Sequence, residues 1–294
     1  MKQEIIWKTL INISKTPLLI KFFQTKPILK ATFYLKIKRA LSKSSPPVLV
    51  YQMGKVASST IYQALIKDED FITFHVHRLN PVNIIKHRQD RIEKGWQTPE
   101  KIHEILSPFI YNNIIKSKIP IKIITLVRDP ISRNISDYFQ VLDQIWSIKN
   151  AYSKLSLEEL TQGFFEKHLD YVPLTWFDLE FKEVLGVDVY KYNFPQDKGY
   201  LQIKSGCYDI LIMKHNLDDQ IKQEILGQFL GKNFSLVSKN VADEKGYADT
   251  YRKFLATVKL PESYVNKMLD SKYTQHFYSN KEINKLKEKW LKKT

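Results

Sequence analysis

The chain has 294 residues, 43% of them hydrophobic and 13% aromatic, which predicts a folded protein with a substantial core and argues against disorder. Cys207 is the single cysteine, which excludes an intramolecular disulfide and a metal cluster built on cysteine. The formal charge of +15 indicates an anionic partner: nucleic acid, anionic lipid, or a phosphorylated or acidic small molecule.

Much of this charge lies at the two ends of the chain. Residues 1–46 carry ten Lys and Arg against one acidic residue, and residues 281–294 carry six Lys against two Glu. We expect residues 1–46 to form a basic helical extension, which either lies on an anionic membrane surface or is solvated and packs on the protein itself. No apolar run reaches the roughly 18 residues of a membrane-spanning helix, so a cytoplasmic protein is expected, held at the inner membrane surface if the extension binds lipid. The nearly neutral middle carries no recognised nucleic-acid module, so nucleic acid is not expected as a partner.

Turn-forming residues at 42–47 predict a linker to a main domain of residues 47–294. Short apolar or alternating runs predict strands at residues 48–52, 71–77 and 120–127. Helical patterns are expected at residues 61–66, 82–118 and 131–149. Further on, strands are predicted at residues 188–192 and 209–214, and helices at residues 157–169, 217–229 and near the C-terminus. This order predicts an α/β fold of the P-loop type, with three layers in which helices flank a central parallel sheet and ligands bind at the carboxyl ends of the strands.

A phosphate-binding loop is predicted between the first strand and the helix after it. Backbone N–H groups at a helix N-terminus attract anions, small residues let the backbone approach them, and a lysine and hydroxyl side chains add donors. The residues expected to bind are Gly54, Lys55, Val56, Ala57, Ser58, Ser59 and Thr60. The nucleotide triphosphatase pattern fails, because Leu49 stands at its first glycine and Val56 follows the lysine. The alternative is a capped helix start with a surface lysine.

A second phosphate clamp is predicted at the end of the third strand. Arg128 leaves this strand at the same edge as Lys55, and Ser136 follows eight residues later in the next helix. A guanidinium and a hydroxyl can bind one phosphate together. Alternatively, Asp129 caps the helix with Pro130 at its first position, and both interpretations can hold at once.

Together these two motifs resemble the sulfotransferase family that uses 3′-phosphoadenosine 5′-phosphosulfate. The resemblance implies that residues 54–60 bind the 5′-phosphosulfate and that Arg128 and Ser136 bind the 3′-phosphate. The Arg-Asp-Pro sequence is most similar to Golgi carbohydrate sulfotransferases and their bacterial relatives. Residues 264–268 and 271–279 resemble a bacterial family of capsular polysaccharide synthesis proteins.

His75-Val-His77 is similar to the His-x-His of the uronyl 2-O-sulfotransferases, which implies that His77 is the catalytic base. Lys55 would then stabilise the leaving phosphate, and no metal is expected. The alternative for either histidine is a structural role in the core. Sulfotransferases close the nucleotide site with a basic loop, and the resemblance implies this role for residues 238–247, with Lys239 and Lys245.

The sequence therefore predicts a sulfotransferase that moves a sulfuryl group to a hydroxyl acceptor, with a carbohydrate of a capsule or exopolysaccharide as that acceptor. One alternative is a kinase-like phosphotransferase, for which Asp129 is the one residue near the position of a magnesium ligand. The other is a non-catalytic basic protein that binds surfaces through its extension.

Overall fold

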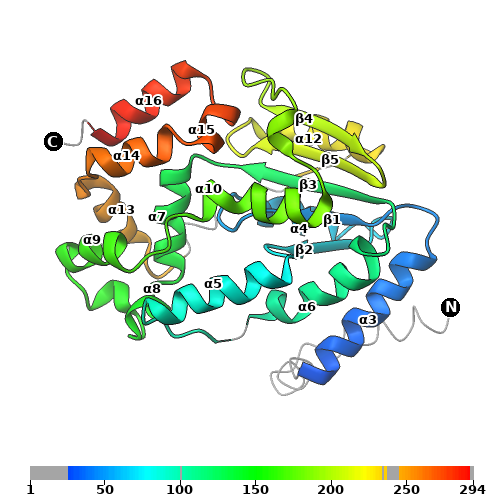
Figure 1. Cartoon of the computed structure of the whole chain (residues 1–294), viewed down its shortest axis with the longest axis horizontal. Helices are drawn as coiled ribbons and strands as arrows, with labels where there is room; N and C mark the ends of the chain where they lie inside the picture. Colours follow the sequence, from blue (N-terminus) through cyan, green and yellow to red (C-terminus); the bar gives the residue numbers. More distant parts are fainter. Residues whose placement is uncertain (1–25, 100, 234, 237–244, 292–294) are drawn as a thin grey trace.

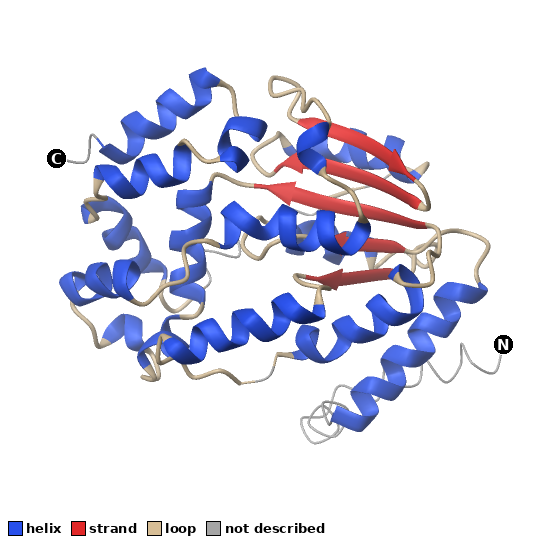
Figure 2. Cartoon of the chain, in the orientation of Figure 1, coloured by secondary structure: helices blue, strands red, loops and turns tan. Residues whose placement is uncertain are grey.

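The computed structural model describes residues 26–99, 101–233, 235–236 and 245–291, which form a mixed α/β fold around one five-stranded sheet (Figures 1 and 2). The strand order is β2-β1-β3-β5-β4, in which β4 is antiparallel to β5 and the other neighbours are parallel. The strands are β1 (Val48–Tyr51), β2 (Thr73–Val76), β3 (Ile121–Val127), β4 (Tyr200–Ser205) and β5 (Tyr208–Lys214). The sequence prediction of an α/β fold is confirmed, with the difference that the sheet is mostly and not wholly parallel.

Helices account for most of the remaining described chain. Those of the first half are α3 (Lys26–Ser42), α4 (Ser58–Leu65), α5 (Pro81–Glu93), α6 (Ile102–Ile110), η1 (Tyr111–Ile115), α7 (Pro130–Gln140) and α8 (Leu142–Trp146). Those of the second half are η2 (Ala151–Ser153), α9 (Leu157–Glu166), α10 (Val172–Trp176), η3 (Phe177–Lys182), α11 (Glu183–Leu185), η4 (Val189–Lys191), α12 (Asp219–Leu230), α13 (Ala248–Thr257), α14 (Glu262–Leu269), α15 (Lys272–Phe277) and α16 (Asn280–Leu291). None of the described helices is both long and apolar enough to span a membrane.

Helices cover both faces of the sheet. Tyr51 of β1 stacks on Phe181 of η3 at 5.3 Å between ring centroids, so α10 and η3 cover one face. The register pairs Val48 of β1 with Lys122 of β3, and the Lys122 ammonium donates to a carbonyl of α12. Because side chains alternate along a strand, Val48 and Lys122 project from the face opposite Tyr51. Figure 1 shows α10 and α12 on opposite sides of the strands in this way.

The described part of the basic N-terminal segment packs against the body of the protein. Phe33 of α3 lies edge-on to Phe74 of β2 at 5.5 Å, and the Lys36 ammonium donates to the Thr73 carbonyl at 2.6 Å. Ile37 and Ala40 of the same helix are buried. Residues 26–42 therefore contribute to the core beside β2, whereas residues 1–25 lie outside the described part of the chain.

Three sequence predictions of secondary structure differ from the structure, one of them only in that the helix expected at residues 131–149 is divided at Val141 into α7 and α8. Residues 188–192 were expected as a strand, but this prediction is wrong: Asp188 accepts from the Tyr190 amide and caps the short 3₁₀ helix η4. The strand in this part of the chain is instead β4, whose pattern of one buried position in six gave little apolar signal. The expected helix at residues 82–118 is interrupted after α5, where Gly95 adopts a φ of 77°.

Candidate functional site

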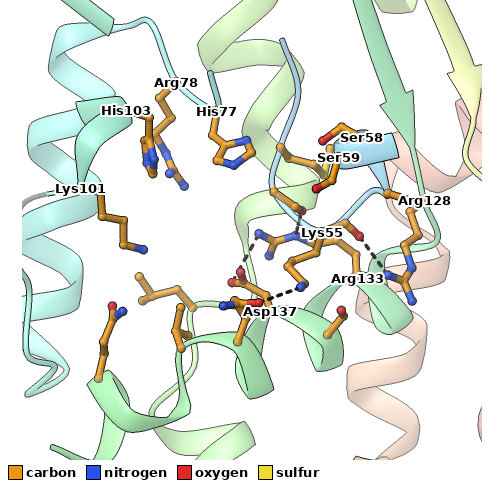
Figure 3. A pocket seen from close by; sticks show the side chains of 18 of the residues that line it. Lys55, Ser58, Ser59, His77, Arg78, Lys101, His103, Arg128, Arg133 and Asp137 are labelled. Atoms are coloured by element: carbon orange, nitrogen blue, oxygen red, sulfur yellow. Dashed lines mark hydrogen bonds and ion pairs between the residues drawn. The ribbon is translucent and has the colours of Figure 1, made fainter. Parts of the chain in front are cut away.

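A cavity of about 910 Å³ lies at the carboxyl ends of β1, β2 and β3. Its walls come from the loop after β1, the end of β2, α5, the start of α6, α7 and residues 245–251 (Figure 3). In parallel α/β folds this edge of the sheet is where ligands bind. The sequence prediction that Lys55 and Arg128 emerge at one edge is confirmed, because both line this cavity.

The loop between β1 and α4 holds two non-glycine residues in the left-handed region. Lys55 has a φ of 73° and Ala57 a φ of 64°, with Val56 between them. No side chain caps the N-terminus of α4 at Ala57. Left-handed residues in such a loop create a concave arrangement of N–H groups that binds anions, and strain of this kind concentrates at functional sites. The loop therefore has the backbone conformation and the uncapped helix start that an anion site requires.

Two arginines hold the loop by its carbonyl groups. Arg128 Nη1 donates to the Lys55 carbonyl at 3.0 Å, and Arg133 Nε donates to the Gly54 carbonyl at 3.1 Å. Arg128 is fixed in turn through its backbone, because the Tyr273 hydroxyl accepts from its N–H at 3.1 Å and donates to its carbonyl at 2.8 Å. The third strand, the loop and α15 are thus joined at this point.

Lys55 and Lys245 face each other across one amide. The Gln140 Oε1 atom accepts from Lys55 at 3.3 Å and from Lys245 at 2.6 Å. Burial, and then the charge of Lys245, lower the pKa of Lys55 to about 8. An anion bound between the two ammonium groups would remove this repulsion, so the pair is suited to a phosphate.

His77 lies beside the phosphate loop with one ring nitrogen free to accept a proton. Its Nδ1 lies 3.0 Å from the Gln52 carbonyl, which can only accept, so Nδ1 carries the proton and Nε2 does not. A Cβ placed on Gly54 would lie 3.9 Å from Nε2, so this nitrogen faces the loop. Burial, with the nearby His75 and His103, lowers the pKa of His77 well below its ordinary value and keeps the ring neutral.

His75 has a structural partner. The His75 Nε2 atom lies 3.2 Å from the hydroxyl of Ser58, a residue that is 6% exposed. Burial lowers the pKa of His75 to about 4. The His75 ring also lies 5.0 Å from that of His77, so the two histidines project to the same side of this segment. Of the two, His77 is the one whose free nitrogen faces the loop.

The segment after His77 is anchored by a buried carboxylate. Glu180 of η3 is fully buried and accepts hydrogen bonds from the Tyr51 hydroxyl, the Leu79 and Asn80 amides and the Asn83 side chain. Burial raises its pKa. The Trp176 indole also donates to the His77 carbonyl at 2.8 Å. These contacts fix the backbone on both sides of Arg78.

Positive charge dominates the cavity. Seven lysine and arginine side chains line it: Lys55, Arg78, Arg91, Lys101, Arg128, Arg133 and Lys245. Asp137 is the one carboxylate among the described lining residues, and it bonds to Arg133 at 3.4 Å and to His168 at 3.1 Å. Burial opposes ionisation of Asp137, but the charge of Arg133 and the bond to His168 outweigh it, so its pKa lies well below the usual range. Such a cavity fits a ligand that carries several negative charges.

The structure brings together nearly all the residues that the sequence singled out. Gly54, Lys55, Ala57, Ser58, Ser59, Thr60, His77, Arg128 and Ser136 line the cavity. The Val56 side chain is fully buried in the core, so a contact from Val56 to a ligand would come from its backbone. Lys245 also lines the cavity, whereas Lys239 lies outside the described residues. Asp129 accepts from the Ser132 amide at 2.8 Å and caps α7, as expected.

Sequence reasoning missed the residues at the far end of the cavity, chiefly Arg78, Arg91, Lys101 and His103. Arg78 had a usable signal, because it directly follows the last histidine of the predicted second strand. Lys101 and His103 had none, since only the break between α5 and α6 brings the start of α6 to the cavity.

A model of the family described as "NKWYS: Putative capsular polysaccharide synthesis protein" matches residues 152–279. This match supports a relation to capsular polysaccharide synthesis, and it spans less than half of the chain. The matched segment supplies Lys245, Tyr247 and Tyr251 to the cavity and Tyr273 to the support of Arg128. Neither a curated protein nor a solved structure matches the chain.

Proposed function

We propose that this protein is a P-loop-type sulfotransferase that moves the sulfuryl group of 3′-phosphoadenosine 5′-phosphosulfate to a hydroxyl group of a carbohydrate. The observation that carries this proposal is that the loop with Lys55, the guanidinium of Arg128 and the imidazole of His77 line one cavity. The loop, whose backbone is strained, is bonded to Arg128, and the free Nε2 of His77 faces the same loop.

The donor would span the cavity between the loop and α7. Lys55 and the N–H groups of residues 54–60 would hold the 5′-phosphosulfate, and Arg128 with Ser136 would hold the 3′-phosphate. The Nε atom of Arg128 is buried without a hydrogen-bond partner in the described part of the chain, so this guanidinium has capacity for another acceptor. Lys245, which shares the Gln140 amide oxygen with Lys55, would add positive charge beside Lys55.

The chemistry follows from these positions. The acceptor oxygen forms a bond to sulfur while the bond from sulfur to the 5′-phosphate oxygen breaks. His77 Nε2 takes the hydroxyl proton, and Lys55 neutralises the charge that develops on the leaving phosphate. The products are a sulfate ester and adenosine 3′,5′-bisphosphate. A neutral histidine suits this step because it can accept the proton without first losing one.

The positions of the two candidate carboxylates favour this reaction over a kinase-like transfer. Phosphoryl transfer from a nucleoside triphosphate uses carboxylates to hold magnesium. Asp129 caps α7 and does not line the cavity, while Asp137 is held by Arg133 and His168. The carboxylates available at the site are therefore committed to contacts within the protein.

The proposal extends the family match to a specific role. The name of the matching family refers to capsular polysaccharide synthesis, and a sulfotransferase acting on sugar hydroxyls of a capsule or exopolysaccharide fits that name. We place the enzyme in the cytoplasm, where the nucleotide donor is made, with residues 1–46 as a contact to the inner membrane surface.

Calorimetric titration with adenosine 3′,5′-bisphosphate, ATP and AMP tests the donor class. We expect binding that needs the 3′-phosphate, weakened about 100-fold in Arg128→Ala and between about 10-fold and 100-fold in Lys55→Ala, because each variant removes a charge-assisted contact. Lys149→Ala, which removes an exposed positive charge that does not line the cavity, is the matched control. Tighter binding of ATP with magnesium, or no binding of the bisphosphate, would contradict the proposal.

A further inference from the structure

The far end of the cavity holds positive charge that the donor site does not use. Figure 3 shows Arg78, Lys101 and His103 on one side of the cavity and Lys55, Arg128 and Arg133 on the other, with His77 between them. On the donor side, Arg128 and Arg133 bond to carbonyls of the loop, Arg133 also pairs with Asp137, and Lys55 bonds to Gln140. The far side therefore requires an explanation of its own.

Arg78 and Lys101 have no hydrogen-bond or ion-pair partner for their side-chain nitrogens among the residues that the structure describes, although both line the cavity. Burial lowers the pKa of both side chains, so solvent does not fully compensate their charges. A half-buried cation without an acceptor is costly unless a ligand supplies one.

Arg91 gives a second, independent sign of a missing acceptor. Its side chain is 1% exposed and lines the cavity, and Nη2 bonds to Glu104 at 2.8 Å. Its Nε and Nη1 are buried and have no partner in the described part of the chain. Buried guanidinium nitrogens are normally satisfied, so these two atoms mark a place where an acceptor is lacking.

These side chains act as one electrostatic group. Burial, and then the charges of Lys101, Arg78 and Arg91 together with His75, lower the pKa of His103 to about 3. Burial and the same three cations also lower the pKa of His87, which lines this end of the cavity. His103 in turn lies 5.2 Å from the ring of His77, so the group begins immediately beyond the proposed base.

We infer that Arg78, Arg91 and Lys101 form an anion subsite for the acceptor, so that the sugar bearing the reacting hydroxyl, or its neighbour in the chain, carries a carboxylate, phosphate or sulfate group. This inference rests on the proposed function, because it takes the loop and Arg128 as the donor site. A negative group held beyond His77 would orient the acceptor, placing its hydroxyl between Nε2 and the donor. The positive start of α6 at Ile102 adds to the attraction.

The test compares acidic and neutral forms of one sugar chain on the protein loaded with adenosine 3′,5′-bisphosphate. The probes are an oligogalacturonate, its carboxyl-reduced counterpart, and the reduced oligomer carrying phosphate or sulfate monoesters, each titrated by calorimetry at constant ionic strength. We expect at least one acidic form to bind about 10-fold or more tightly than the neutral form. The three acidic arms distinguish carboxylate, phosphate and sulfate.

Variants assign the preference to these residues. Arg78→Gln and Lys101→Gln should each remove most of the preference for the acidic form, Arg78→Lys should keep part of it, and bisphosphate affinity should stay within about 2-fold of wild type. Lys149→Gln, with the same change of charge outside the cavity, should keep the full preference.

Equal binding of acidic and neutral forms to the wild type, or a preference that survives in Arg78→Gln and Lys101→Gln, overturns the inference. Loss of bisphosphate affinity in these two variants also overturns it, since the cations would then belong to the donor site. If the wild type binds no bisphosphate but still prefers acidic oligomers through Arg78, the subsite stands and the proposed function falls.

Discussion

The two ends of the cavity differ in how their cations are used. At the end proposed to bind the donor (the donor end), Arg128 and Arg133 bond to the carbonyls of Lys55 and Gly54 and so hold the loop in shape. At the end proposed to bind the acceptor (the acceptor end), the side-chain nitrogens of Arg78 and Lys101 have no hydrogen-bond or ion-pair partner among the described residues. The donor-end arginines therefore hold the loop in shape, whereas we propose that the acceptor-end cations pair with a ligand. Substitutions at the two ends should consequently impair different properties of the protein.

The largest effect is expected between the two ends, at His77. His77→Ala removes the nitrogen proposed to accept the hydroxyl proton, so kcat should fall about 100-fold to 10,000-fold while bisphosphate affinity stays unchanged. A radiolabelled sulfuryl-transfer assay with a glycan acceptor, together with calorimetry, measures both quantities. The neutral His77 also predicts that the acidic limb of the activity profile lies below pH 6.5, because protonation occurs only well below the ordinary histidine pKa.

His276→Gln serves as the control for this substitution, because His276 lies on α15 and does not line the cavity. It should leave kcat at the wild-type value. If His77→Ala kept full activity, His77 would not be the catalytic base, and its role would be structural.

A smaller effect is expected at the donor end, where the affinity for the bisphosphate should depend on pH. Under the proposed function Lys55 binds phosphate as a cation, and its pKa of about 8 means that this form is present below pH 8 and is lost as the pH rises through that value. Bisphosphate affinity should therefore fall about 10-fold between pH 7.5 and pH 9.5. Calorimetry in buffers of different ionisation enthalpy should also show proton uptake on binding near pH 8.

Lys55→Arg separates this titration from general effects of pH, because a guanidinium stays charged throughout the range. The variant should bind the bisphosphate with an affinity that does not change between pH 7.5 and pH 9.5. A decline as steep as that of the wild type would assign the titration to another group.

The smallest effect is expected at Tyr273, which supports the donor end from the C-terminal half. Tyr273→Phe removes both hydrogen bonds to the Arg128 backbone, so we expect a loss of about 1 to 3 kcal/mol in the free energy of unfolding and a several-fold loss of bisphosphate affinity. Thermal or urea unfolding and calorimetry measure the two losses. Tyr192→Phe, at a partly exposed tyrosine outside the cavity, should change neither.

The donor end could be predicted from the sequence because its chemistry is local. Lys55 and Arg128 each follow a strand directly, so the parallel arrangement of β1 and β3 is enough to bring them together. The same reasoning places His75 in β2 and His77 directly after it beside the loop, since β2 pairs with β1. Side chains alternate along a strand, so residues 75 and 77 point to the same side, and their rings lie 5.0 Å apart.

The acceptor end and the C-terminal support could not be predicted in this way. Lys101 and His103 reach the cavity through the break between two helices, and Tyr273 reaches Arg128 across 145 residues of sequence. Such contacts depend on how helices pack and leave no local pattern. The strand predicted at residues 188–192 failed for a related reason, because the side chain of Asp188 bonds to the Tyr190 amide and favours a 3₁₀ turn.

The pairing of β1 with β2 bears on how such a protein can diverge in evolution. The loop proposed to bind the donor and the proposed base directly follow two strands that are hydrogen-bonded neighbours, so their separation is set by the sheet, at about 4.8 Å per strand. The acceptor end is carried largely by α5 and the start of α6, outside the sheet. Under the proposed function, exchange of residues 78–103 between relatives is therefore expected to change the acceptor preference while the reacting groups keep their spacing.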